Sequence, residues 1–260
     1  MSAVLSHDFA RARGGRFLLR IEDIDPGRTR EEFVGGIEAD LRWLGLDWDG
    51  PAVRQSERLP LYAEALERLK RQGLVYPCFC TRADIARSAA APHGPEGPLY
   101  PGTCRGLADP NLTRPHAWRL DVAKAMALAG PLEWHDAQAG DVAARPELIG
   151  DVVLARKDAP TSYHLAVTVD DAAQGVTDVI RGADLFLSTH VHRLLQALLG
   201  LPTPAYHHHP LIIGPDGERL AKRHGALSLA DLRAQDVDPA TIVAAFRKGR
   251  APLGFALGEA

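Results

Sequence analysis

The chain has 260 residues, of which 46% are hydrophobic and 24% are charged, and these values are ordinary for a soluble globular protein. The formal net charge of -3 at pH 7 argues against indiscriminate binding to nucleic acid, but it does not exclude a local basic patch that docks one folded RNA. No apolar run approaches the roughly 20 residues of a membrane-spanning helix, and the opening residues contain no apolar signal-peptide core, so the sequence predicts a cytosolic protein.

The N-terminal part of the chain predicts a strand followed by helices. Phe17–Ile21 is a short apolar run after two glycines, which is typical of a buried strand. Apolar residues at helical spacing predict a helix over Glu31–Leu44, which Gly45 ends, and another over Leu59–Gln72, which Gly73 ends. This alternation indicates an α/β fold with a parallel sheet and crossover helices.

An insertion rich in proline, glycine and cysteine follows, between Cys78 and about Arg114. It contains all three cysteines of the chain, an odd number that makes a poor disulfide framework. Cys78 and Cys80 on one tight turn can hold a zinc ion that Cys104 and a fourth ligand complete. His93 is the generic fourth ligand because imidazole is the commoner zinc donor. Three buried, inert thiols are the alternative.

The rest of the chain continues the α/β pattern. Strands are predicted over five segments, about His116–Asp121, Asp151–Leu154, Tyr163–Val169, Val176–Ile180 and Tyr206–Ile213. Helices are predicted over about Thr189–Leu199, Leu229–Ala234 and Pro239–Phe246.

Acidic residues directly follow the first predicted strand, in the segment LRIEDID. Carboxylates at the carboxyl end of a parallel strand lie where open α/β sheets bind ligands, and they suit an ammonium group. A solvated acidic turn has the same composition. The longer segment RFLLRIEDIDPGRTR resembles the glutamate-specific class I aminoacyl-tRNA synthetases. In the expected order, DVVLARKDAPTSYHLAVTVDDAAQGVTDVIRGADL resembles that family's amino-acid pocket, and AYHHHPLIIGPDGERLAKRHGA resembles the strand and loop of its KMSKS-type signature.

The resemblance extends from about Leu5 to Phe246 and implies a domain organisation. A Rossmann-type catalytic domain is expected over 1–77 and 115–247, a zinc-containing insertion over 78–114 and a C-terminal tail over 248–260. The opening residues resemble the helix that follows the HIGH signature, so the N-terminal strand and that signature are expected to be missing. An overlooked upstream start codon and a truncated remnant are the two explanations.

The resemblance also assigns roles in substrate binding. Glu22 is expected to contact the amino group of glutamate, Tyr163 to contact glutamate through its hydroxyl, and Arg181 to pair with a substrate carboxylate. A planar guanidinium binds a carboxylate through two hydrogen bonds, which independently favours glutamate over an uncharged isostere. Taken singly, Tyr163 is also compatible with a packed core aromatic and Arg181 with a surface ion pair.

A basic loop resembles the KMSKS signature, which closes on ATP in class I synthetases. It consists of Arg219, Leu220, Ala221, Lys222 and Arg223. Lys222 is the expected catalytic and ATP-binding residue, because an ammonium group neutralises charge that develops on the phosphates. Ala221 stands where the signature has serine, so the loop is a degenerate copy. A basic loop without this context is typical of solvated surface.

The fourth zinc ligand and the histidine run remain to be considered as parts of metal sites. By resemblance to the short glutamyl-Q branch of the family, Tyr100 takes the fourth zinc position beside Cys78, Cys80 and Cys104, as a structural site. The run His207–His209 does not form a metal site, because consecutive residues of a strand point to opposite faces.

The resemblance therefore implies a monomeric ligase that activates glutamate with ATP and Mg²⁺ and transfers it to the queuosine of tRNA(Asp). The chain finishes soon after Phe246, where full glutamyl-tRNA synthetases continue into a helical anticodon-binding domain. Two alternatives stay open: a truncated glutamyl-tRNA synthetase that charges tRNA(Glu), and a non-catalytic RNA-binding remnant.

Overall fold

The computed structural model describes residues 1–25, 27, 29–87, 93–94, 97–214, 220 and 228–258. These residues form two compact units. The first consists of Met1–Arg54, Val179–Asp184 and His207–Ala260, and the second of Gln55–Asp178 and Leu185–Tyr206. None of the described helices has the length and apolar character that crossing a bilayer requires.

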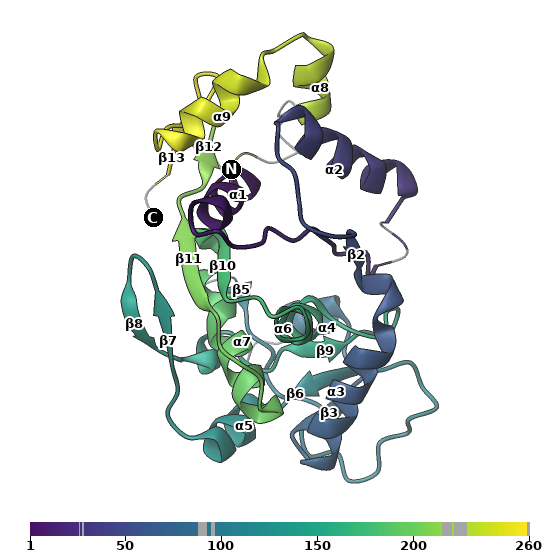
Figure 1. Ribbon diagram of the computed structural model, residues 1–260. Helices are drawn as coiled ribbons and strands as arrows, with labels where there is room; N and C mark the ends of the chain where they lie inside the picture. The colour runs from purple at the N-terminus through teal and green to yellow at the C-terminus, as the bar shows by residue number, and fades with distance from the viewer. Residues whose placement is uncertain are drawn as a thin grey trace. The chain divides into compact units, whose positions relative to one another are not determined.

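The first unit packs helices around short strands (Figure 1). Its described helices are α1 (Ser2–Ala12), α2 (Glu31–Trp43), α8 (Leu229–Ala234) and α9 (Pro239–Arg247). Its strands form two pairs, β1 (Arg20–Ile21) parallel to β2 (Val53–Arg54) and β12 (Ile212–Ile213) antiparallel to β13 (Ala256–Leu257). The core joins the two ends of this unit's sequence, because Val4 and Ile21 share one apolar cluster with Ile242 and Phe246.

The second unit contains the three cysteines and most of the helices and strands of the chain. Its described elements are η1 (Gln55–Glu57), α3 (Leu59–Arg71), β3 (Val75–Cys78), α4 (Arg82–Arg87), β4 (His93–Gly94), β5 (Gly97–Pro98), β6 (Ala117–Leu120), α5 (Val122–Ala129), β7 (Glu133–Asp136), β8 (Gly140–Ala143), η2 (Pro146–Leu148), β9 (Val153–Ala155), α6 (Tyr163–Ala173) and α7 (Phe186–Leu199). Strands β10 (Asp178–Gly182) and β11 (Ala205–His209) and the short helix η3 (Ala183–Leu185) belong partly to each unit.

Two sheets carry Cys78 and Arg181, in β3 and β10. One has the order β3-β6-β9 and is antiparallel throughout. The other has the order β10-β11-β7-β8, in which β11 is parallel to β7 and β7 is antiparallel to β8. The expected parallel sheet is therefore present only in part, as a mixed α/β arrangement.

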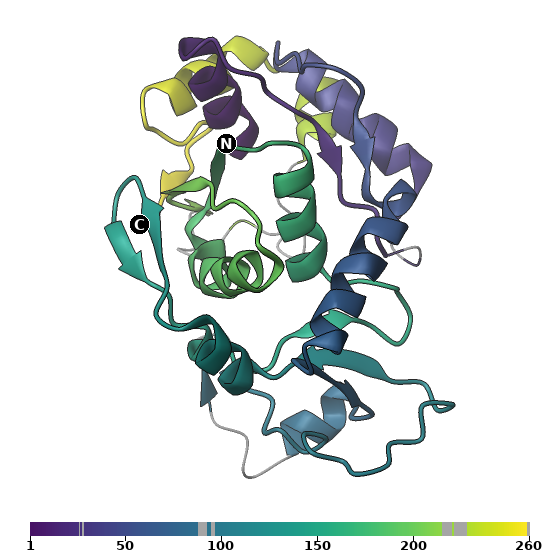
Figure 2. The same cartoon turned by 60° about the horizontal axis from the view of Figure 1, so that its bottom comes forward.

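Helices α3, α6 and α7 lie side by side in the second unit (Figures 1 and 2). The carboxylate of Asp170 in α6 is fully buried and accepts hydrogen bonds from Gln55, Arg58 and Tyr62 at 2.9, 2.6 and 2.7 Å. A buried carboxylate needs such partners, so this cluster fixes α6 against α3. Helix α7 ends at Gly200, whose φ of 62° is readily adopted only by a residue without a Cβ.

The helix predictions are confirmed. Helices α2, α3, α8 and α9 match their predicted spans within a residue, and α7 begins three residues before the predicted Thr189. Gly45 and Gly73 have φ values of 72° and 67°, as helix-ending glycines do.

Several strand predictions are wrong or too long. Tyr163–Val169 belongs to helix α6 and not to a strand. Residues on nearly every side of the first two turns of this helix are buried, so its apolar residues do not follow a helical period, and the sequence pattern predicted a strand instead. The strand predicted at Tyr206–Ile213 is two strands, β11 and β12, separated at Pro210. Only Arg20–Ile21 of the first predicted strand pairs as a strand.

Candidate functional site

The three cysteines come together in the second unit. Strand β3 ends at Cys78, the turn after it presents Cys80, and the later loop returns Cys104, so that the three sulfurs lie within 4.8 Å of one another. The Sγ atoms of Cys80 and Cys104 are 3.6 Å apart, and the Tyr100 hydroxyl lies 3.7 Å from the Cys80 sulfur. A tetrahedral zinc ion with Zn–S bonds of about 2.3 Å separates two sulfurs by about 3.8 Å, so these residues fit zinc.

Tyr100 is held with its oxygen toward the sulfurs. Its side chain is buried, and its hydroxyl accepts a hydrogen bond of 2.8 Å from the backbone N–H of Cys104. Burial and the neighbouring thiols, Cys104 and Cys78 foremost, raise the pKa of Tyr100. Burial opposes ionisation of Cys104, but hydrogen bonds led by that of Tyr100 outweigh it and lower the pKa of this thiol. A bound metal ion favours the ionised forms of such ligands.

Two cations lie close to this cluster. The Arg119 guanidinium stacks on the Tyr100 ring at 4.0 Å, and Lys157 Nζ donates to the backbone carbonyls of Phe79 and Cys80 at 2.8 and 3.2 Å. These contacts fix the turn between the cysteines and offset the negative charge that several ionised ligands would concentrate. The side chain of His93, the generic alternative ligand, lies outside the described side chains.

The acidic segment after β1 contains one exposed and one buried carboxylate. Glu22 is exposed, and its Oε1 lies 3.6 Å from the Arg20 guanidinium. Asp23 is buried and accepts a hydrogen bond of 2.9 Å from Arg54, which also binds Glu31 at the start of α2. The role of Asp23 is not predictable from the sequence, because an acidic run does not reveal which carboxylate turns inward.

Arg181 lies in β10 and is almost completely buried. Its Nε donates a hydrogen bond of 3.2 Å to Nε2 of the buried His208 in β11. The histidine run by itself gives no sign of this contact, because it depends on two strands that are distant in sequence.

The three consecutive histidines of β11 lie on two faces, with His207 and His209 against α1 and His208 on the opposite side. His207 packs against the Phe9 ring at 4.7 Å, and His209 Nε2 lies 2.7 Å from the Ser2 hydroxyl. His208 instead meets Arg181 of β10, so the three side chains alternate between two faces, as the strand pattern predicts.

Tyr163 is the first residue of α6 and lies against two histidines. Its ring centroid is 5.4 Å from that of His164 and 5.6 Å from that of His192. His164 Nδ1 and His192 Nε2 are 3.2 Å apart, so one ring nitrogen donates to the other. The helix start places the Tyr163 side chain at the edge of this pair, where it is partly exposed.

Most of the expected ATP-binding loop lies outside the described residues, namely Arg219, Ala221, Lys222 and Arg223. Leu220 is described, and its backbone N–H donates to the carbonyl of Ile212 at 3.0 Å. The role of Lys222 therefore stays a prediction.

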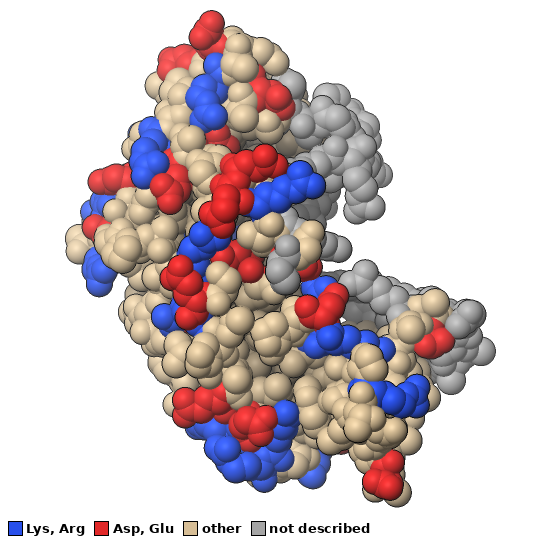
Figure 3. Space-filling view, turned by 90° about the vertical axis from the view of Figure 1, so that its right-hand side faces the viewer, with Lys and Arg blue, Asp and Glu red and all other residues tan. Residues whose placement is uncertain are grey.

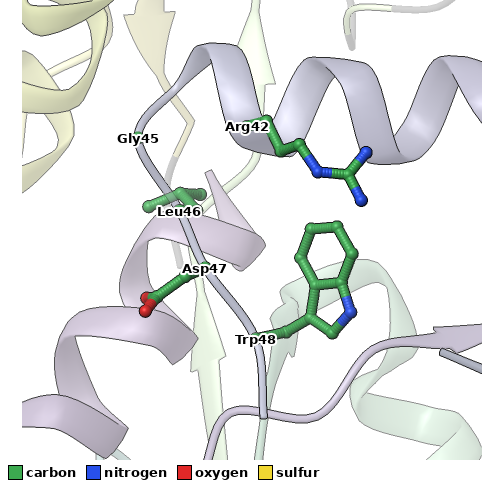
Figure 4. Close-up of a pocket in the computed structure, with 5 residues that line it drawn as sticks. All are labelled: Arg42, Gly45, Leu46, Asp47 and Trp48. Carbon is green, nitrogen blue, oxygen red and sulfur yellow. The ribbon is translucent and has the colours of Figure 1, made fainter. Parts of the chain in front are cut away.

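A pocket of about 400 Å³ in the first unit contains none of the predicted site residues. It is lined by Arg42, Gly45, Leu46, Asp47 and Trp48 (Figure 4). The Arg42 guanidinium lies over the Trp48 indole at 4.8 Å, which closes one side of the pocket.

Comparison with known proteins gives one consistent result. The family model for class I tRNA synthetases (E and Q), catalytic domain, matches residues 1–253. A glutamyl-Q tRNA(Asp) synthetase of Rhodobacter capsulatus is 53% identical over 253 residues, which cover 93% of this chain and 91% of that protein. The protein with the same name from Symbiobacterium thermophilum is 48% identical, with 93% and 78% covered.

A solved structure agrees with this result. The chain aligns with the glutamate-tRNA synthetase of Elizabethkingia anophelis at a TM-score of 0.69 and 27% identity, covering 86% of this chain and 49% of the synthetase. It therefore spans about half the length of that enzyme. The resemblance inferred from three sequence segments is confirmed: the chain belongs to the class I tRNA synthetase (E and Q) catalytic domain family.

Proposed function

We propose that this chain is an ATP-dependent ligase that activates glutamate and transfers it to the queuosine of tRNA(Asp). The observation that carries the proposal is the 53% identity, over 93% of the chain, to a glutamyl-Q tRNA(Asp) synthetase. The family match over residues 1–253 supports the general activity, since it comprises synthetases for E and Q.

In the first step, a carboxylate oxygen of glutamate attacks the α-phosphorus of ATP, and the bond to the leaving pyrophosphate breaks. Glu22 binds the substrate ammonium group, Tyr163 donates its hydroxyl to glutamate, and Arg181 binds a carboxylate. The contact with His208 supports this role, because it holds the buried guanidinium of Arg181 in one orientation. Lys222 and the Mg²⁺ that accompanies ATP neutralise charge on the phosphates.

In the second step, a hydroxyl of the queuosine cyclopentene diol attacks the carbonyl carbon of glutamyl-adenylate. An ester bond forms, AMP leaves, and the hydroxyl proton passes to solvent. The diol resembles the terminal ribose diol that ordinary synthetases acylate, so the same pocket chemistry serves both acceptors. Positioning of the reactants supplies most of the rate.

The proposed structural zinc ion is held by Cys78, Cys80, Tyr100 and Cys104. The sulfur and oxygen spacing supports this ligand set, and the ion would staple the insertion 78–114 between the proposed catalytic segments 1–77 and 115–247.

Two assays test the function. Glutamate-dependent exchange of pyrophosphate into ATP reports the first step. Labelled glutamate is then offered with tRNA(Asp) or with tRNA(Glu), each either untreated or oxidised beforehand with periodate, which destroys both the queuosine diol and the 3′-terminal ribose diol. Nuclease fragments of the tRNA locate the label. Periodate-sensitive labelling of the anticodon loop of tRNA(Asp) is expected. Labelling of tRNA(Glu) at its 3′ end would instead identify a truncated glutamyl-tRNA synthetase, and no exchange would identify a non-catalytic RNA-binding remnant.

The Arg181→Lys variant tests the amino-acid pocket. We expect the KM for glutamate in pyrophosphate exchange to rise at least about tenfold, because an ammonium group replaces a planar two-pronged donor with a point charge. Arg145→Lys, at an exposed ion pair with Glu147, is the matched control. An unchanged KM in Arg181→Lys contradicts the assignment of Arg181 to the pocket.

A further inference from the structure

Helix α7 buries two histidines, and one of them lies against a residue of the proposed glutamate site. His190 and His192 are 3% and 2% exposed. His190 accepts a hydrogen bond from the Trp134 indole, whereas His192 lies against Tyr163, the first residue of α6. Helices α6 and α7 lie side by side within the second unit (Figure 1). Of the two buried imidazoles, His192 is therefore the one that can act on Tyr163.

His192 forms a compact group of three rings with Tyr163 and His164. Nε2 of His192 lies 3.2 Å from Nδ1 of His164. The Tyr163 ring centroid lies 5.4 Å from that of His164 and 5.6 Å from that of His192, and the two imidazole centroids are 5.3 Å apart. Each ring therefore lies against the other two, so a change in either imidazole alters the space that holds the Tyr163 ring.

The hydrogen bond between the two histidines fixes how both imidazoles are turned. An imidazole nitrogen is either a donor or an acceptor, so one of the two facing nitrogens carries a hydrogen and the other accepts it. This bond restricts rotation of both side chains. His192 is almost completely buried, whereas His164 is partly exposed. The buried ring of α7 is therefore the anchor that holds the more exposed ring of α6.

The first turn of α6 depends on contacts from outside the helix. The first N–H groups of a helix have no partner within it, so its start is held less firmly than its middle. Among the described residues, the Ser162 side chain forms no capping hydrogen bond with this turn. The pair of imidazoles supplies an outside contact, because His164 of the first turn binds His192 of α7.

Selective binding of a small amino acid requires side chains that are held in place. Long-range attraction raises the rate at which a charged ligand arrives, but fixed donors and acceptors select it. The face shown in Figure 3 agrees with recognition of this kind, because its acidic and basic side chains are intermingled. Recognition of glutamate then depends on how firmly a residue such as Tyr163 is oriented.

We propose that His192 is a positioning residue for the binding of glutamate. Its hydrogen bond to His164 holds both imidazoles against the Tyr163 ring, so that the Tyr163 hydroxyl meets the amino acid in one position. This inference rests on the proposed function, in which that hydroxyl contacts glutamate. His192 acts through Tyr163 and does not itself contact the substrate. The hydroxyl contributes equally to glutamate bound before and during adenylate formation, so its displacement raises the KM and leaves kcat unchanged.

Two pairs of variants test the hydrogen bond from both sides. His192→Phe and His164→Phe keep a ring but remove the facing nitrogen, whereas His192→Gln and His164→Asn keep a polar atom near the positions of Nε2 and Nδ1. In pyrophosphate exchange without RNA, we expect each phenylalanine variant to raise the KM for glutamate about tenfold, with kcat and the KM for ATP within about twofold of the parent. The amide variants should restore the KM for glutamate to within about threefold. Because His164 is partly exposed, its variants put folding at less risk.

A double-mutant cycle shows whether His192 acts through the tyrosine hydroxyl. Tyr163→Phe removes that hydroxyl and should itself raise the KM for glutamate. In the Tyr163→Phe background, His192→Phe is expected to change this KM by less than about twofold, because the group that it positions is gone. A general loss of packing would instead act to the same extent in both backgrounds.

Crystal structures of the variants without substrate follow the tyrosine directly. We expect the Tyr163 hydroxyl to move by about 1 Å or more in His192→Phe, a displacement large enough to weaken binding, and to keep its parent position in His192→Gln. His190→Gln is the matched control, because it removes a similarly buried imidazole of the same helix that contacts Trp134. It should leave both the Tyr163 position and the KM for glutamate unchanged.

Several outcomes overturn the inference. They are an unchanged KM for glutamate in both phenylalanine variants, an equal rise of this KM in His190→Gln, an equal effect of His192→Phe with and without the Tyr163 hydroxyl, and a Tyr163 side chain that keeps its parent position in His192→Phe. Any of these in a parent protein that exchanges pyrophosphate overturns the inference alone. Absence of glutamate-dependent exchange in the parent overturns the proposed function and the inference together.

Discussion

At the cysteine cluster, one phenol oxygen completes a set of four potential ligand atoms. Three thiols in a short, proline-rich segment were sufficient to predict the cluster, since no other cysteines compete for pairing. The identity of the fourth ligand did not follow from spacing alone. The structure brings Tyr100 to the sulfurs because the loop between Tyr100 and Cys104 folds back onto the tyrosine hydroxyl.

Substitution of Tyr100 by phenylalanine tests its role as a ligand. We expect the Tyr100→Phe protein to bind zinc at least about tenfold more weakly, because a donor atom is lost while the ring is kept. Competition with a chromogenic chelator measures this affinity, and metal analysis of the purified protein measures occupancy.

The control for this experiment is Tyr62→Phe, which removes another buried tyrosine hydroxyl, bound to Asp170. His93→Ala is measured alongside. Full zinc affinity in Tyr100→Phe together with its loss in His93→Ala would assign the fourth position to the histidine.

At the scale of single elements, helix α6 shows why the sequence pattern predicted a strand where the structure has a helix. Its first residues, Tyr163–Val169, read as a β-branched and apolar strand, yet the helix continues to Ala173. Asp170 holds this helix in place, because its carboxylate accepts hydrogen bonds from the side chains of Gln55, Arg58 and Tyr62. These contacts join segments more than 100 residues apart, and local periodicity contains no information about them.

The Asp170→Asn variant tests this cluster. We expect a loss of about 3 kcal/mol in unfolding free energy, because the partly buried Arg58 guanidinium loses its anionic partner. Urea denaturation followed by circular dichroism measures the change. Asp141→Asn, at an exposed pair with His135, is expected to change stability by less than about 0.5 kcal/mol. Equal effects of the two substitutions would contradict a structural role for Asp170.

Helix α7 makes stability depend on pH. Burial lowers the pKa of His190, whose Nδ1 accepts a hydrogen bond of 3.2 Å from the Trp134 indole. The neutral imidazole is therefore the form that suits the folded state. Below a pH of about 6.5 the unfolded chain binds a proton that the folded chain does not, so unfolding free energy falls as the pH falls.

We expect the His190→Gln variant to flatten this dependence. Between pH 7 and pH 5, the slope of unfolding free energy against pH should be smaller in this variant than in the parent. The difference should be at most about 1.4 kcal/mol per pH unit, which is the value for one proton. Urea denaturation at a series of pH values measures it. His135→Gln, at an exposed imidazole, should keep the parent slope, and an unchanged slope in His190→Gln would exclude His190 as the titrating group.

At the scale of the whole molecule, the described chain divides into two compact units, and the cysteine cluster belongs to the second. Removal of the proposed zinc ion from this cluster should therefore affect the second unit more than the first. We expect chelation to increase amide hydrogen exchange in β3 and β6 and to leave α1 and α9 unchanged. Hydrogen exchange with mass spectrometry, with and without chelator, measures this. Equal deprotection of α9 would show that the ion supports both units.

The sequence by itself determined the family, most helices and the cysteine cluster. These features depend on residue order and local spacing, because helix ends, strand alternation and motif segments are written in neighbouring residues. Only the tertiary structure decided that Asp23 and Asp170 turn inward and that His208 accepts a hydrogen bond from the Arg181 guanidinium. The reason is physical: burial and cross-strand register arise from contacts between segments far apart in the chain, and no local pattern specifies which of several polar side chains finds a partner there.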